Sequence, residues 1–164
     1  MISKKMEKAI NEQINKEMFS AYLYLAMATK ADMMVFKGTA QWFRVQAKEE
    51  WGHAMKFYKY LLDQGATVEL QALAKPAVTW NSILEMYVAA LKHEKFITAS
   101  INGLVAQATA EKDNASMIML QWFVTEQVEE EANATEIIAQ LKLVGGSAGG
   151  VFMIDHHLGK REAK

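Results

Sequence analysis

Apolar residues recur at spacings of three and four along almost the entire chain, and this periodicity restricts the chain to helices. The periodic stretches cover residues 4–32, 39–65, 82–111 and 114–143. Only one proline and nine glycines occur among the 164 residues, so little interrupts these stretches. A half-buried strand would instead need alternating apolar and polar residues. The sequence therefore predicts an all-α fold.

The connections between the stretches predict how the helices are arranged. Residues 33–38 and 111–114 are short turns, whereas residues 66–81 form a long connection. A link of ~16 residues can span one helix length when extended, at ~3.3 Å per residue. Asn81 or Ser82 is the expected N-cap of the third helix. Two antiparallel hairpins joined by one crossover give an antiparallel four-helix bundle.

A glycine-rich joint over residues 145–150 and a short apolar-faced segment over about 151–160 complete the chain. A helix this short is unstable alone. We therefore expect a fifth helix that docks within the subunit or between subunits. The predicted unit is one domain over residues 1–164, with its bundle at about 4–143.

Every helical stretch carries ionisable or amide groups in the middle of its apolar stripe. Six of them lie about 14–19 residues from the middle of the nearest short turn and hence at similar heights along the bundle: Glu17, Glu50, His53, Glu94, Gln127 and Glu130. An offset of 77 residues maps the first three of these onto the last three, and Glu49 onto Glu126. The two hairpins therefore repeat one pattern, which predicts a single polar layer in the bundle interior.

Four carboxylates cannot stay ionised together in an apolar interior without a positive charge. The four stripes contain no lysine or arginine, and the chain contains no cysteine. Oxygen and imidazole ligands remain, so the layer predicts bound metal cations. The alternative is a set of protonated carboxyl groups that hydrogen-bond to one another.

Charge and hydropathy exclude several partners. Eighteen basic and nineteen acidic residues give a net charge of −1, so no basic footprint points to nucleic acid. The start of the chain lacks the apolar core of a signal peptide, and no stretch has the ~18 apolar residues of a membrane span. We expect a cytoplasmic protein without membrane partners.

The pattern Glu17…Tyr24, Glu50-x-x-His53, Glu94 and Gln127-x-x-Glu130 resembles the ferroxidase centre of non-haem bacterial and archaeal ferritins. The resemblance extends over residues 10–158, including the crossover and the short last helix. It implies that this is a ferritin-like domain whose layer binds two iron ions.

The resemblance also implies a role for each residue. Glu17, Glu50 and His53 would bind one iron, and Glu50, Glu94 and Glu130 the other, with Glu50 as the bridge. Gln127 would be a weak ligand or a hydrogen-bond donor to bound dioxygen or water. Tyr24 matches the redox-active tyrosine of the family, and its alternative is a core aromatic that bonds a carboxylate.

A second acidic set lies next to the first. Glu49, Glu126 and Glu129 match positions that hold a third iron in bacterial ferritins, while the alternative is a solvated acidic face. Trp51 and Gly52 stand where bacterioferritins carry their haem-ligating methionine, so no haem is expected.

The remaining aromatic and histidine candidates carry weaker expectations. Trp122 could donate an electron, although a packing role is favoured. Each of His93, His156 and His157 is expected to be a surface side chain, with weak metal binding open for the last two.

The implied function is iron storage: Fe(II) is oxidised by dioxygen at the di-iron layer, and Fe(III) is kept as mineral inside a hollow homo-oligomer of 24 subunits, which some archaeal relatives pack as an open shell. Two alternatives remain. One is a structural bundle with a vestigial polar layer. The other is a di-iron oxygenase or peroxidase, which Gln127 and the missing cysteines disfavour.

Overall fold

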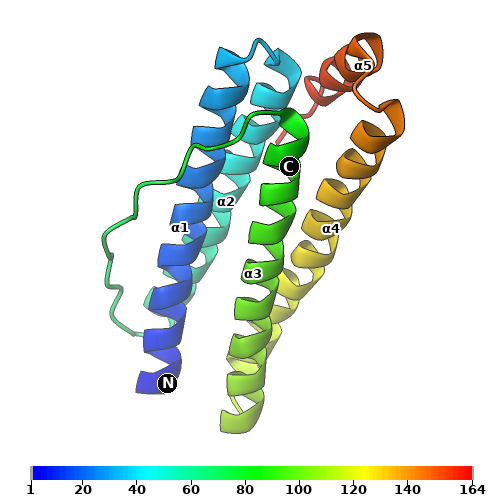
Figure 1. The fold of residues 1–164 in the computed structure, drawn as a ribbon. Helices are drawn as coiled ribbons and strands as arrows, with labels where there is room; N and C mark the ends of the chain where they lie inside the picture. The colour runs from blue at the N-terminus through cyan, green and yellow to red at the C-terminus, as the bar shows by residue number, and fades with distance from the viewer. Residues whose placement is uncertain (1, 164) are drawn as a thin grey trace.

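The computed structural model describes residues 2–163, which contain five helices and no strand (Figure 1). The helices are α1 (Lys4–Met33), α2 (Lys37–Asp63), α3 (Ile83–Glu111), α4 (Asn114–Val144) and α5 (Ala148–Leu158). The predicted all-α bundle with a short fifth helix is confirmed. Residues 1 and 164 of the predicted domain lie outside the described part.

Local side chains determine where most helices begin. The hydroxyl of Ser3 accepts from the Met6 N–H, and the hydroxyl of Ser82 accepts from the Glu85 N–H at 3.1 Å. Such caps satisfy backbone donors that lack a partner in the first turn. Of the two expected N-caps of α3, Ser82 therefore has this role.

The glycine-rich joint is shorter than expected. Gly145 and Gly146 adopt positive φ values of 55° and 82°, a conformation that glycine tolerates best, and α4 ends there. The Ser147 side chain then accepts from the Gly150 N–H and starts α5 at Ala148. Residues 148–150, which we expected in the joint, are therefore helical.

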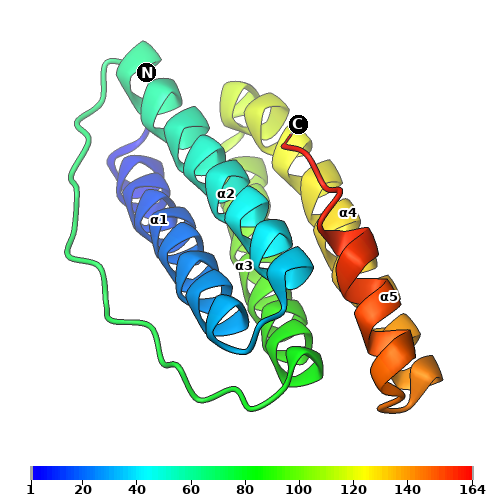
Figure 2. The ribbon, with the colours of Figure 1, turned by 90° about the horizontal axis from the view of Figure 1, so that it is seen from above.

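The long crossover runs along the outside of α1 (Figures 1 and 2). The Asn11 side chain on α1 donates to the Thr67 carbonyl at 2.9 Å and accepts from the Glu69 N–H at 2.7 Å. Asn15 donates to the Ala72 carbonyl at 3.2 Å. These bonds hold a segment without helix or strand against the bundle and satisfy its backbone.

The bundle interior consists of two apolar clusters. One lies toward the α1–α2 turn and contains Phe43, Tyr87 and Ile138, while the other contains Met6, Phe57 and Leu120. The six polar candidates belong to neither cluster and lie at the heights between them. The apolar clusters therefore shield the polar layer from solvent along the bundle axis.

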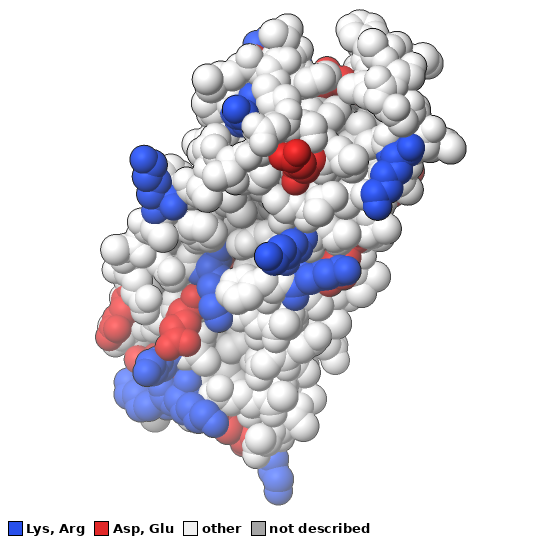
Figure 3. All heavy atoms as spheres, viewed as in Figure 1, with Lys and Arg blue, Asp and Glu red and all other residues white. Residues whose placement is uncertain are grey.

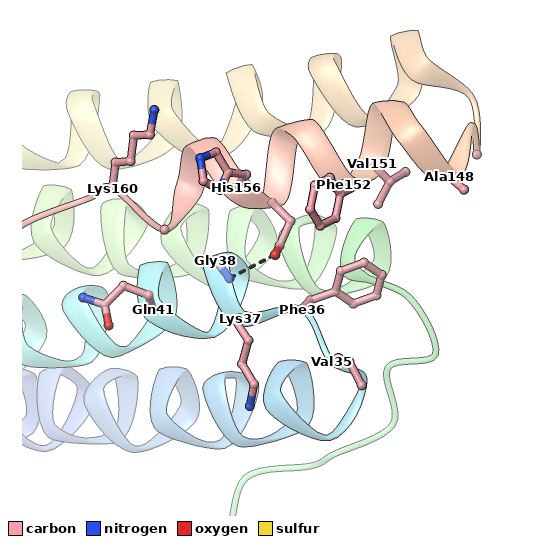
Figure 4. A pocket seen from close by; sticks show the side chains of 13 residues that line it. Val35, Phe36, Lys37, Gly38, Gln41, Ala148, Val151, Phe152, His156 and Lys160 are labelled. Carbon is pink, nitrogen blue, oxygen red and sulfur yellow. Dashed lines mark hydrogen bonds between the residues drawn. The ribbon is translucent and has the colours of Figure 1, made fainter.

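Helix α5 docks on the start of α2 (Figure 4). The Asp155 carboxylate accepts from the Gly38 and Thr39 N–H groups at 3.0 and 2.7 Å, and thus supplies the cap that α2 lacks locally. A Cβ atom on Gly38 would lie 1.6 Å from the Asp155 carbonyl oxygen, so only glycine permits this approach. A pocket of about 780 Å³ opens beside this contact.

Charged side chains of both signs are scattered over the face in Figure 3, with uncharged surface between them. In the described part of the chain, no helix has the length and apolar character needed to cross a membrane.

Candidate metal centre

All four bundle helices contribute to the polar layer, and every one of its side chains is buried. The structure brings together the six residues that the sequence pointed to: Glu17, Glu50, His53, Glu94, Gln127 and Glu130. None of them is more than 5% exposed. The apolar stripe of each helix thus places its polar side chains in one buried layer.

Within residues 2–163, three groups of three side chains could each hold a metal ion, and two of these groups lie wholly within the layer. Glu17, Glu50 and His53 offer ligand atoms within 4.8 Å of one another, and so do Glu50, Glu94 and Glu130. His53 Nδ1 lies 3.2 Å from Glu50 Oε2. Glu50 belongs to both groups, so its carboxylate lies between two candidate metal positions.

Two buried glutamines, which we did not single out as site residues, supply hydrogen bonds from the first hairpin. Gln13 Nε2 donates to Glu17 Oε1 at 2.8 Å. Gln46 Nε2 donates to Glu50 Oε1 at 2.8 Å and to Glu130 Oε2 at 2.7 Å. Each glutamine lies four residues before a layer glutamate, and this Gln-x-x-x-Glu spacing is the signal that could have revealed them.

The second hairpin orients Gln127 through a longer chain of bonds. Thr98 donates to the Glu131 carboxylate at 2.6 Å, so its oxygen can only accept from Gln127 Nε2 at 3.3 Å. The same amide nitrogen donates to Glu94 Oε2 at 3.1 Å, and the Tyr24 hydroxyl donates to Glu94 Oε1. Thr98 and Glu131 therefore turn the Gln127 amide toward Glu94, and neither was identified from the sequence.

Burial raises the pKa of all four layer carboxyls and is the largest cause at each. The pKa of Glu17 rises to about 8, with the Glu50 charge adding to burial. The pKa of Glu130 rises to about 7, where Glu94 adds and Gln46 opposes. The metal-free layer therefore retains protons near neutral pH. A cation that enters takes the place of these protons, so binding releases protons and strengthens as the pH rises.

Tyr24 is buried in the first apolar cluster and in contact with the layer. Burial and the Glu94 charge raise the pKa of its phenol well above the usual value. The ring stacks on Phe43 with centroids 5.9 Å apart. Its position fits a core aromatic whose hydroxyl bonds a carboxylate, and the redox role of Tyr24 stays a prediction.

The second acidic set is divided in the structure. Glu126 offers a ligand atom within 4.8 Å of those of His53 and Glu130. Glu49 instead accepts from Arg161 Nη2 at 2.5 Å, and Glu129 is exposed. The grouping of Glu49, Glu126 and Glu129 stays a prediction.

One histidine differs from expectation. His93 is half-buried: its Nε2 lies 2.7 Å from the Ser20 hydroxyl, its ring lies against Phe19 and Tyr24, and burial lowers its pKa to about 4. The other two, His156 and His157, are exposed as expected.

Trp122 lies beside the centre, on the same side as His53. Its ring packs edge-on against His53, with centroids 5.3 Å apart. Packing is thus the role that the contacts support.

A ferritin-like domain is matched over residues 7–144 of this chain. The chain is 38% identical to a probable bacterial non-haem ferritin-like protein of Haemophilus influenzae, covering 100% of this chain and 99% of that protein. It is 39% identical to a bacterial non-haem ferritin of Bacteroides fragilis, covering 98% and 100%.

Solved structures agree with these relatives. An engineered closed form of the Archaeoglobus fulgidus ferritin superposes with a TM-score of 0.98 at 43% identity, and the match covers 100% of both chains. The open-pore ferritin of the same archaeon gives a TM-score of 0.98 at 42% identity, covering 99% of this chain and 100% of that one.

Proposed function

The chain belongs to the ferritin family, and from this premise we propose that it stores iron and that its polar layer is the centre where Fe(II) is oxidised. The position of Glu50 is the observation that carries this proposal. Its buried carboxylate is shared by the two ligand groups that lie wholly within the layer. A carboxylate shared between two ligand groups is expected where two metal ions bind as a pair, whereas a layer with only a packing role would not need one.

Iron is the substrate, and each ligand group receives one ion. Glu17 and His53 bind the first Fe(II), Glu94 and Glu130 bind the second, and Glu50 bridges the two. Carboxylate oxygens are hard ligands that suit iron, and they favour Fe(III) over Fe(II).

The redox step needs both ions. Two Fe(II) ions lose one electron each, and one dioxygen takes these two electrons with two protons and becomes hydrogen peroxide. Two Fe(III) ions result, which move on to the mineral. Pairing the ions lets one oxygen molecule take both electrons in one place.

The neighbouring side chains orient the ligands. Gln13 and Gln46 donate to Glu17 and Glu50 and so hold these carboxylates in place before iron enters. Gln127 acts as a hydrogen-bond donor beside Glu94 and leaves an open position for dioxygen or water. Tyr24 adjoins the second position through Glu94, to which its hydroxyl donates.

A third iron completes the proposed centre. Glu126 and Glu130, with Glu49 and Glu129 nearby, would bind it on the side of the layer that α2 and α4 form. It would give Fe(III) a carboxylate path out of the bundle.

We further propose a cytoplasmic homo-oligomer of 24 subunits around a mineral cavity. Helix α5 supports assembly, because Phe152 and Met153 are 70% and 73% exposed and leave apolar surface for another subunit. The Archaeoglobus fulgidus neighbours include an open-pore ferritin and an engineered closed form.

The Glu50→Ala variant tests the proposal. Metal-free protein is mixed with two Fe(II) per subunit in air, and the rise of Fe(III) absorbance is followed. Wild type should oxidise iron rapidly and yield soluble mineral, whereas Glu50→Ala should fall to the rate of protein-free buffer. Glu12→Ala, at an exposed position of α1, is the matched control and should behave as wild type.

Two outcomes contradict the proposal. Wild type that oxidises iron no faster than buffer would favour a structural bundle with a vestigial layer. A Glu50→Ala variant that oxidises two irons per subunit at the wild-type rate would show that Glu50 is not the shared ligand.

A further inference from the structure

The segment after α5 continues in the direction of α5 and lies beside α2 and α4 (Figure 2). Its Ala163 lines a cleft of about 410 Å³ together with Glu49, His53 and Glu126. This cleft is the side of the metal centre on which we place the third iron. The tail therefore lies where iron would leave the layer.

Arg161 anchors this tail through two contacts. Its Nη2 lies 2.5 Å from Glu49 Oε2, and its guanidinium lies over the Trp42 ring at 4.2 Å from the centroid. The Arg161 side chain is 16% exposed and that of Glu49 is 8% exposed. An ion pair this sheltered is screened little by water or salt, unlike a pair on the surface.

The pair explains why Glu49 is missing from the ligand groups. Its neighbours in the cleft, His53 and Glu126, form a group with Glu130, whereas the Glu49 carboxylate is turned to Arg161. A carboxylate oxygen bonded to a guanidinium cannot coordinate a metal with the same lone pair. A cation arriving at Glu49 therefore competes with Arg161 for Oε2.

We propose that Arg161 is a gate for the third metal position, a fixed cation that holds Glu49 until a metal ion displaces it and releases the tail. This inference rests on the proposed function, since it needs the two inner positions to bind metal. Lys48 and Lys56 also line the cleft, but both are exposed, and Lys56 lies over Trp122. Arg161, by contrast, is bonded directly to the Glu49 carboxylate.

The gate couples the outer position to the tail. While Arg161 holds Glu49, the outer position has fewer ligands and binds metal weakly. Once Arg161 leaves, Glu49 joins Glu126 and Glu130, and the cleft opens as Ala163 moves away. Iron then has a route outward only when a further cation is present to take the place of the guanidinium.

Zinc titration of the assembled metal-free protein tests the gate without redox chemistry. Wild type should bind two Zn²⁺ per subunit tightly and a third weakly. Arg161→Gln should leave the two inner affinities unchanged and tighten the third by about tenfold or more, as expected when a close charged competitor is removed. Lys160→Gln removes the same charge from the adjacent, exposed position and is the matched control.

Crystals soaked in Zn²⁺ locate the third ion. Density between Glu49 and Glu126 in Arg161→Gln, with Glu49 turned to it, would support the gate. Arg161→Lys keeps a charge but loses the planar fork, so it should give an intermediate third affinity.

The results separate the two proposals. If no variant binds two inner Zn²⁺ ions, the proposed function fails. If the inner sites fill and the third affinity is equal in wild type and Arg161→Gln, the gate is wrong. An Arg161→Gln protein that no longer assembles, with Arg161→Lys binding as wild type, would make Arg161 a structural anchor and would equally overturn the gate.

Discussion

Replacing Glu17 by glutamine should stabilise the metal-free protein at alkaline pH and remove part of its pH dependence. Glu17 is 1% exposed, and its Oε2 has no hydrogen-bond partner among the described residues. Burial and the Glu50 charge raise its pKa from 4.5 to about 8. Glutamine has nearly the same shape as the protonated acid and cannot ionise.

The sign follows from proton binding. Between pH 4.5 and about 8 the folded protein keeps the Glu17 proton that the unfolded chain has lost. The folded state therefore binds more protons, and its stability falls as the pH rises through this window. The stabilising contribution is complete below pH 4.5 and is lost as the pH passes about 8.

The size of the effect follows from the pKa shift. Each pKa unit corresponds to about 1.4 kcal/mol. Glu17 alone should then cost wild type about 3–4 kcal/mol of folding free energy between pH 5 and pH 8. For a chain of this size, 1 kcal/mol shifts the melting temperature by about 2–4 °C, so the expected difference is about 10 °C.

The assay compares melting temperatures of chelator-treated wild type and Glu17→Gln at several pH values. The curves should lie close together at pH 5 and diverge toward pH 8, where Glu17→Gln melts higher. Titrating groups that do not interact with Glu17, those at subunit contacts included, cancel in the difference. Glu12→Gln, an exposed acid on the same helix, should follow wild type at every pH. Parallel curves for Glu17→Gln and wild type would refute a buried, protonated Glu17.

Three further variants test separate parts of the structure. Gly38→Ala places a Cβ against the Asp155 backbone, so it should destabilise the protein by about 1–3 kcal/mol or more in thermal melts, while Gly52→Ala, with no atom within 4 Å, should not. Thr98→Val frees the Gln127 amide and should weaken the second of the two inner Zn²⁺ affinities about tenfold by calorimetry; unchanged binding would show that the amide needs no support. Deletion from residue 145 onward should leave a helical bundle by circular dichroism but alter assembly by light scattering, and an unchanged particle would contradict the role of α5.

The apolar periodicity and the turn residues of the sequence were sufficient to predict the four-helix bundle. Four apolar stripes and the short–long–short connections determine four helices and their hairpin order, because these signals are local. The six layer residues could also be found from the sequence, since a carboxylate on an apolar stripe is conspicuous and four at one height need a shared explanation. The boundaries of α5 could not be predicted from the sequence. Two glycines end α4 and Ser147 caps α5, so the start of α5 depends on a few adjacent residues.

Contacts between segments that are far apart in the chain could not be predicted from the sequence. Asp155 caps α2 across 116 residues of chain, and Arg161 reaches Glu49 across 112. No spacing rule relates such pairs, because their meeting depends on how α5 turns on the bundle. The partial burial of His93 was missed for the same reason, since it depends on packing against α1.

The sequence by itself determined which residues face the interior, and hence that carboxylates, an imidazole and an amide share one layer. Only the tertiary structure decided how these groups are oriented: which oxygen Gln46 holds, which way the Gln127 amide turns and which carboxylate Arg161 takes. The physical reason is the distance over which each kind of interaction acts. Helical periodicity acts over one or two turns and is written in neighbouring residues, whereas a side-chain hydrogen bond is settled within about 3 Å by atoms that the fold brings from another helix.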